Sequence, residues 1–180
     1  YKAMKNAYAG HLKYSFQLRP HTVADQAYIG AYQGIGVGYF NFGNPEELGN
    51  PLAVYLFQGG RIAQFSPRIS LNYEWNFGAS FGWKPYDEYD NPENQIIGSK
   101  VNAYLNVNLY LKWALSPKFD LMIGTTGSHF SNGNTQYPNS GLNTVDCKVG
   151  LVYNFNRRAD ELAQSWQRPI VPPFPRHVSY

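Results

Sequence analysis

Apolar and polar residues alternate over two unusually long stretches of the chain, and this alternation limits the fold more than any other feature. Between Ile69 and Trp83 the odd-numbered residues are all apolar, namely Ile69, Leu71, Tyr73, Trp75, Phe77, Ala79, Phe81 and Trp83. The residues between them are polar or small. A second stretch repeats the pattern with Val101, Ala103, Leu105, Val107, Leu109, Leu111, Trp113 and Leu115. A helix, with its period of 3.6 residues, cannot separate these side chains onto two faces, so both stretches are predicted as strands.

The length of these strands points to a membrane. A strand of 15 residues is roughly 50 Å long, whereas an ordinary soluble strand has about 5 to 6 residues. Tilted by roughly 40°, it crosses an apolar band about 25 Å tall and extends beyond it. Trp83 and Trp113 lie near strand ends, where interfacial aromatic girdles are expected.

The composition agrees with this interpretation and excludes other classes. Only 15% of the residues are charged and 17% are aromatic, whereas soluble domains carry roughly 25% charged residues. No run reaches the roughly 18 apolar residues of a membrane-spanning helix, so a membrane would be crossed by strands. A net charge of +3 is too small for a nucleic-acid surface, and the single Cys147 excludes a thiolate cluster. We expect no metal and no cofactor.

The same alternation predicts five further strands, at 11–19, 28–42, 52–58, 119–131 and 142–155. Short connections containing Gly59 and Gly60, or Ser116 to Lys118, alternate with longer ones at 43–50, 85–94 and 132–141. This is typical of an all-β, antiparallel outer-membrane barrel. Because bacterial barrels have an even number of strands, we expect eight. The strand that is not among these seven lies within residues 1–10, upstream of residue 1, or in the C-terminal segment.

Three glycines at alternate positions, Gly34, Gly36 and Gly38, lie within one predicted strand. Their spacing does not fit a dinucleotide-binding loop, so we expect them to make room inside a narrow barrel. The barrel is predicted to span residues 1–156. The remaining 157–180 contain a short helical pattern and a segment with four prolines, 168–176, and are expected to be an extension or linker.

A histidine and a serine stand side by side at the end of one strand. His129 and Ser131 share the face of Phe119, Leu121 and Ile123 and are about 6.6 Å apart along the strand. A His beside a Ser is the smallest apparatus for acyl transfer, because the imidazole takes the hydroxyl proton and the oxygen attacks an ester carbonyl. If this face meets lipid, the ester must lie in the bilayer.

The surrounding stretch resembles the signature of the lipid A 3-O-deacylase family, a family of outer-membrane acyloxyacyl hydrolases. The shared elements are HxSN at a strand end, PNxG in the next loop and a partner residue at the start of the following strand. The residues in register are His129, Ser131, Asn132, Pro138, Asn139 and Gly141. The resemblance implies that Ser131 is the nucleophile and His129 the general base, with Asn132, Gly133 and Asn139 as oxyanion donors.

The third catalytic position of the family is typically Glu, and Asn143 occupies it here. An amide can accept the imidazole N–H and fix its tautomer, although it stabilises the imidazolium less than a carboxylate does. The nearest acid, Asp146, has the opposite parity and is expected on the lumen face. We therefore expect weaker activity, a dyad, or loss of catalysis.

The resemblance implies a serine esterase in the bacterial outer membrane that acts on lipid A, or lipopolysaccharide, in the outer leaflet. Whether the active unit is a homodimer stays open. Two alternatives also remain. One is a catalytically inactive barrel that binds lipid or anchors a module, and the other is a soluble barrel holding a hydrophobic ligand. The soluble barrel requires Trp75, Leu105 and Ile123 to be buried, whereas the membrane barrel exposes them.

Overall fold

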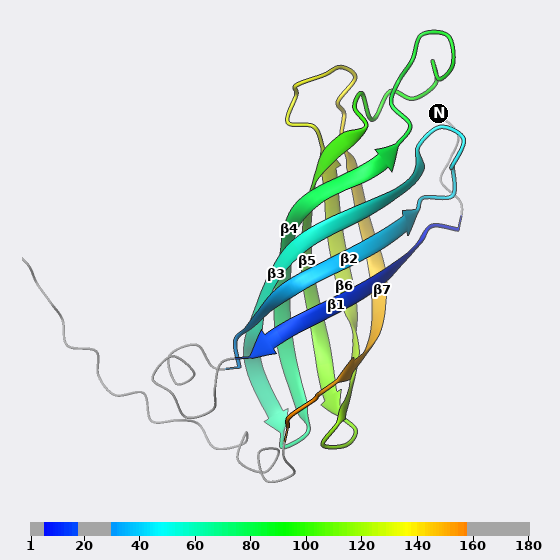
Figure 1. Cartoon of the computed structure of the whole chain (residues 1–180). Coiled ribbons are helices and arrows are strands. Elements are labelled where there is room, and N and C mark those ends of the chain that lie inside the picture. Colours follow the sequence, from blue (N-terminus) through cyan, green and yellow to red (C-terminus); the bar gives the residue numbers. More distant parts are fainter. Residues whose placement is uncertain (1–5, 18–29, 158–180) are drawn as a thin grey trace, which may run out of the picture.

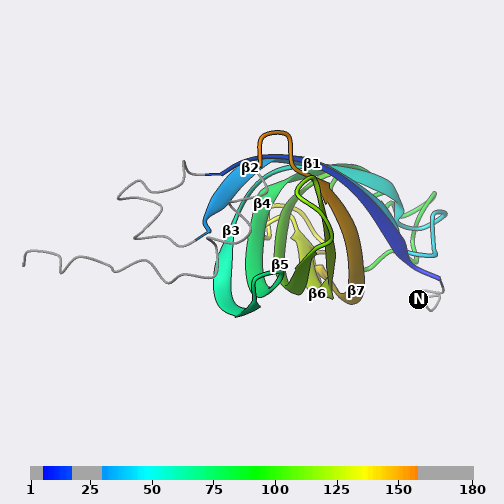
Figure 2. The ribbon, with the colours of Figure 1, turned by 90° about the horizontal axis from the view of Figure 1, so that it is seen from below.

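The computed structural model describes residues 6–17 and 30–157, which form a single curled sheet (Figures 1 and 2). Seven strands lie within these residues: β1 (Tyr8–Gln17), β2 (Tyr32–Asn41), β3 (Gly49–Ser66), β4 (Ile69–Trp83), β5 (Val101–Ala114), β6 (Phe119–Ser131) and β7 (Leu142–Tyr153). Each strand pairs with the next in antiparallel register, so the sheet follows chain order from β1 to β7. The predicted all-β antiparallel architecture is confirmed as a half-barrel. An eighth strand is not among the described residues and stays a prediction.

The outward face of the sheet is apolar. Trp75, Leu105 and Ile123 are 45%, 44% and 51% exposed, whereas a soluble barrel with an apolar lumen would bury them. That alternative is therefore wrong. None of the described residues forms a helix long and apolar enough to cross a membrane.

Strand β3 is longer than the alternation predicts. Gly59 and Gly60 were expected in a turn, yet β3 continues past them to Ser66, and the turn follows at Pro67. Gly59 lies where the ring of Tyr32 crosses the strand, and an added Cβ there would clash with that side chain. This glycine therefore serves close packing within a strand, and the prediction of a turn was wrong.

Trp83 lies inside the barrel, and its predicted place in an outward girdle is wrong. Gly82, the residue before Trp83, has a φ of +87°. This conformation ends the alternation between inward and outward side chains in β4. The indole stacks on Phe42, with ring centroids 5.5 Å apart, and donates its N–H to Ser80 Oγ at 2.9 Å. Trp113 keeps its parity and is exposed.

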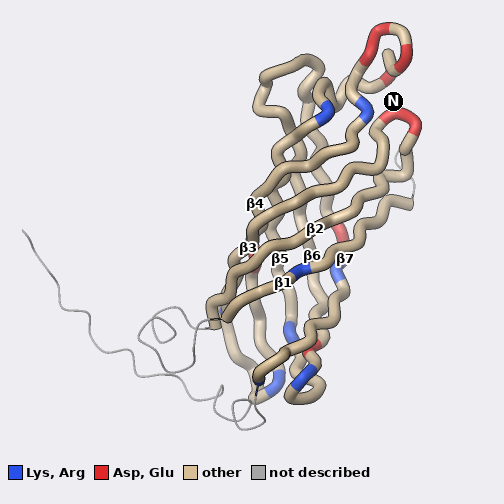
Figure 3. Tube along the Cα trace, viewed as in Figure 1, with Lys and Arg blue, Asp and Glu red and all other residues tan. Residues whose placement is uncertain are grey.

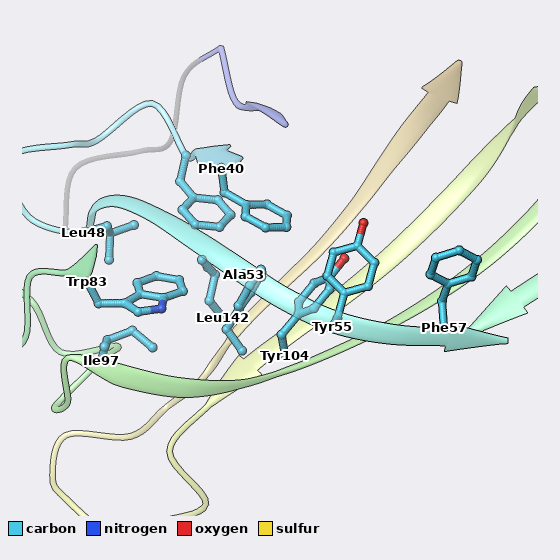
Figure 4. Close-up of a cluster of buried hydrophobic side chains, with 11 residues drawn as sticks. Phe40, Leu48, Ala53, Tyr55, Phe57, Trp83, Ile97, Tyr104 and Leu142 are labelled. Atoms are coloured by element: carbon cyan, nitrogen blue, oxygen red, sulfur yellow. The ribbon is translucent and has the colours of Figure 1, made fainter. Parts of the chain in front are cut away.

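The lumen contains two layers, one aromatic and aliphatic and one polar and charged. At the end with the long loops, aromatic and aliphatic side chains pack together (Figure 4); they are Phe40, Phe42, Leu48, Ala53, Tyr55, Phe57, Trp83, Ile97, Tyr104, Phe130 and Leu142. Below them, the buried carboxylate of Glu74 pairs with Lys13 of β1 and with Lys148 of β7, the latter at 3.5 Å. This carboxylate links the two edge strands across the lumen.

The three alternating glycines of β2 face this interior, as predicted. An added Cβ at Gly36 would lie 2.8 Å from the hydroxyl of Tyr55, and one at Gly38 would lie 2.9 Å from the ring of His11. At Gly34 it would lie 2.7 Å from Phe57. The missing side chains make room for the aromatic rings.

At the end with the short turns, Arg157, which follows β7, forms an ion pair with Asp120 of β6. The guanidinium of Arg157 donates to both carboxylate oxygens of buried Asp120, at 2.6 and 2.8 Å, and to backbone oxygens of Ser116 and Pro117. Arg157 is therefore held by the barrel, although the predicted boundary places it in the extension. The predicted extension beyond it, 158–180, lies outside the described residues.

Candidate active site

The outward face of β6 ends in two polar residues that meet a third from β7. His129 Nε2 lies 2.9 Å from Ser131 Oγ, and His129 Nδ1 lies 2.7 Å from Asn143 Oδ1. His129 and Asn143 are directly opposite each other in the β6–β7 register. The sheet thus brings together the three residues that the sequence placed on one face.

These contacts fix the role of each ring nitrogen. The amide oxygen of Asn143 only accepts hydrogen bonds, so the proton of a neutral imidazole lies on Nδ1. Nε2 of His129 is then free to accept the hydroxyl proton of Ser131. This is the geometry that a general base and a serine nucleophile require, at a separation within hydrogen-bond reach.

The aromatic cluster supports this strand end from inside. Phe130, between the two catalytic candidates in sequence, points into the lumen and is fully buried. Its ring lies 5.1 Å from Phe40, 5.2 Å from Trp83 and 5.1 Å from Tyr104, measured between centroids. Because neighbouring residues on a strand point to opposite faces, anchoring Phe130 inside holds the residues on either side outward.

The loop after Ser131 carries the remaining candidates. The backbone N–H of Asn132 donates to Asn139 Oδ1 at 3.1 Å, and its side-chain amide donates to the Gln136 carbonyl at 2.7 Å. The backbone N–H and one amide N–H of Asn132 are therefore used within the loop, while the second N–H of its NH₂ group is left. Gly133, with a φ of +64°, has no acceptor for its N–H among the described residues. The second amide N–H of Asn132, the Gly133 N–H and the NH₂ group of Asn139 thus donate to none of the described residues.

Contacts with the β4–β5 connection, which spans 84–100, fix the position of this loop. The Gly141 N–H donates to the Ile96 carbonyl at 3.3 Å, and Ser140 Oγ donates to the Gln95 carbonyl at 3.1 Å. At Gly98, an added Cβ would lie 2.7 Å from the backbone of 137–138. These contacts join segments about 40 residues apart in the chain, so no local sequence pattern predicts them.

Gly141 lies against the imidazole itself. Its φ is +69°, and an added Cβ would lie 3.1 Å from His129 Cε1 and 3.2 Å from the Phe130 carbonyl. Both the backbone conformation and the space therefore require glycine. This explains in physical terms the glycine of the PNxG element.

The other acidic residues lie away from the pair. Asp146 accepts a hydrogen bond at 2.8 Å from Thr144 Oγ1, and its parity is opposite to that of Asn143. In the loop above the sheet (Figure 3), backbone N–H groups of Asp90 and Tyr89 donate to Asp87 and lower its pKa. No group of three or more metal-ligating side chains occurs within 6–17 or 30–157.

Comparison with known proteins gives a family match over most of the chain. The family model described as lipid A 3-O-deacylase (PagL) matches residues 1–154. This match includes all seven strands and the loop from Asn132 to Gly141. Neither the curated proteins nor the solved structures contain a significant match.

Proposed function

Because the chain belongs to the lipid A 3-O-deacylase family, whose members are outer-membrane enzymes, we propose that Ser131 hydrolyses an ester-linked acyl chain of lipid A. The observation that carries this proposal is the continuous hydrogen-bonded series from Asn143 through His129 to Ser131 on the outward face. A lipid ester in the outer leaflet reaches this face without entering the barrel. The bacterial outer membrane is therefore the expected location.

In the first half of the reaction, His129 Nε2 takes the hydroxyl proton as Ser131 Oγ attacks the ester carbonyl carbon. The resulting oxyanion receives hydrogen bonds from the free amide N–H of Asn132, the Gly133 N–H and the Asn139 amide, while the Asn132 backbone N–H positions the Asn139 side chain. Collapse of the tetrahedral species breaks the bond to the sugar oxygen, which takes the proton from His129. The acyl chain is then held as an ester on Ser131.

In the second half, His129 removes a proton from water, which attacks the acyl-serine carbonyl. The free fatty acid leaves, and Ser131 recovers its proton from His129. Asn143 accepts the Nδ1–H throughout and keeps the imidazole in one tautomer. The donors of the loop contribute most in the transition state, where the oxygen is negative.

The test compares lipid A from cells that make the wild-type protein and from cells that make Ser131→Ala. Mass spectrometry is expected to show loss of one acyl chain with the wild type only. Equal acylation in both strains, with equal amounts of each protein in the outer membrane, would refute the proposal.

A second candidate function follows from Asn143, which replaces the typical Glu of the family. A neutral amide stabilises the imidazolium less than a carboxylate, so the chain could be a barrel that binds lipid without cleaving it. The same cells separate the two functions, because a lipid-binding barrel leaves the acylation of lipid A unchanged.

A further inference from the structure

A pocket of about 420 Å³ opens at the rim of the sheet, at the end of β5 that pairs with Ser131. Its lining residues are Pro85, Gly98, Ser99, Lys100, Val101 and Gln136. Val101 lies two residues above Ala103 on the same face of β5, and Ala103 pairs with Ser131. The pocket and the nucleophile therefore share one face of the barrel, with the pocket on the side of the long loops.

One wall of this pocket is held in place by hydrogen bonds within residues 99–102. Ser99 Oγ donates to the Val101 carbonyl at 2.9 Å, and the Asn102 side chain donates back to the Ser99 carbonyl at 3.0 Å. These bonds form a tight turn around Lys100. On the opposite wall, Gln136 belongs to the loop that packs against Gly98.

Lys100 gives the pocket its charge. It is the one ionisable side chain among the lining residues, and it is exposed. Ser99, Gln136 and the adjacent backbone supply neutral polar groups. Such a set suits a sugar carrying an anionic substituent, because an ammonium binds a phosphate as a point charge while amides and hydroxyls bind sugar oxygens.

The geometry points to a subsite for the phosphorylated glucosamine of the substrate, in which Lys100 binds the phosphate on the sugar whose ester is cleaved. This inference rests on the proposed function. Three residues separate Lys100 from Ala103, which is about 10 Å along a strand. A lysine side chain spans part of this distance. A sugar ring with a phosphate at C1 and an ester at C3 would span the remaining distance.

The same placement orients the lipid. With its phosphate at Lys100 and its ester at Ser131, the acyl chain extends downward over the apolar outer face of β5 and β6, past Leu105 and Val107. The headgroup then lies at the loop end and the hydrocarbon in the bilayer. Lys100 is accordingly a residue that determines which ester reaches Ser131.

The test uses the purified full chain in detergent micelles and two lipids, diphosphorylated lipid A and lipid A lacking the phosphate at C1. For Lys100→Ala we expect kcat/KM to fall about five- to tenfold on the diphosphorylated lipid and to stay unchanged on the other. Lys118→Ala, which removes the same charge from the opposite end of the barrel, serves as the matched control and should alter neither value. An equal fall on both lipids, or no fall on either, would overturn the inference.

A binding measurement keeps this inference separate from the proposed function. Ser131→Ala protein, with and without Lys100→Ala, is titrated with vesicles containing each lipid. A preference for the C1-phosphorylated lipid that disappears with Lys100→Ala supports the subsite even if the wild type releases no fatty acid, which would refute the hydrolase alone. Equal affinity for the two lipids in the presence of Lys100 would refute the subsite.

Discussion

Asn143 occupies the position where the resemblance to the family implies a glutamate, and its substitution tests the role of the third residue. Asn143 Oδ1 lies 2.7 Å from His129 Nδ1. Asn143→Asp keeps the shape of the side chain and replaces the amide by a carboxylate at the same point, while Asn143→Glu restores the typical family residue. Asn143→Ala removes the hydrogen bond altogether.

The structure sets the size of each effect. A single hydrogen bond between neutral groups contributes about 1 kcal/mol net, so Asn143→Ala should lower kcat about fivefold. A carboxylate about 4 Å from the imidazolium adds about 1 kcal/mol in water and about 4 kcal/mol at an effective dielectric constant of 20. Asn143 is exposed on the outward face, which meets lipid rather than bulk water, so the lower value is a minimum, and Asn143→Asp or Asn143→Glu should raise kcat about fivefold or more.

The assay is release of fatty acid from lipid A by the purified variants, with heat-modifiable electrophoretic mobility as the check of folding. The expected order of kcat is Asn143→Asp or Asn143→Glu above the wild type, and Asn143→Ala below it. Complete loss of activity in folded Asn143→Glu would show that the third position has been misassigned. Unchanged activity in Asn143→Ala would refute any contribution from this side chain.

Three further substitutions test the support of the site and of the barrel. Gly141→Ala forces a side chain into a left-handed conformation against His129, and should lower kcat at least tenfold while the barrel still folds, as monitored by fatty-acid release and circular dichroism. Arg157→Ala leaves the buried carboxylate of Asp120 unpaired, and should reduce the free energy of unfolding in urea by about 3 kcal/mol or more; an unchanged urea midpoint would contradict this role. Phe130→Ala empties the centre of the aromatic cluster and should cost about 3 to 5 kcal/mol in the same measurement, whereas the exposed Phe65→Ala should cost far less.

Alternation alone predicted much of the sheet. The bounds of β4 and β6 follow directly from it, and parity was enough to place His129, Ser131 and Asn143 on one face. This works because the two faces of these strands meet different surroundings, so that each position is apolar or polar for a physical reason.

The two wrong predictions, the outward position of Trp83 and the turn at Gly59 and Gly60, both involve glycines. Gly82 shifts the parity and turns Trp83 inward, while Gly59 and Gly60 continue a strand because aromatic rings occupy the space of their side chains. Glycine occurs in turns, in bulges and in closely packed strands, and the sequence alone does not distinguish among them. Only the residues packed against it distinguish these cases.

The support of the catalytic loop could not be predicted from sequence for another reason. Gln95 and Ile96 bind the loop through backbone carbonyls, and Gly98 does so by close approach. None of these contacts depends on a characteristic side chain, so no local pattern marks them. The inward position of Phe130, in contrast, is predictable, because its parity is opposite to that of His129 and Ser131.

In the proposed mechanism, His129 activates Ser131 as a nucleophile on the outward face of the barrel. It is tested most directly by exposing the purified protein to a lipophilic fluorophosphonate and locating the label by peptide mass spectrometry. We predict a single adduct on Ser131 that is lost in Ser131→Ala and strongly reduced in His129→Ala. An adduct on another residue, or equal labelling of Ser131 without His129, would refute these roles of Ser131 and His129.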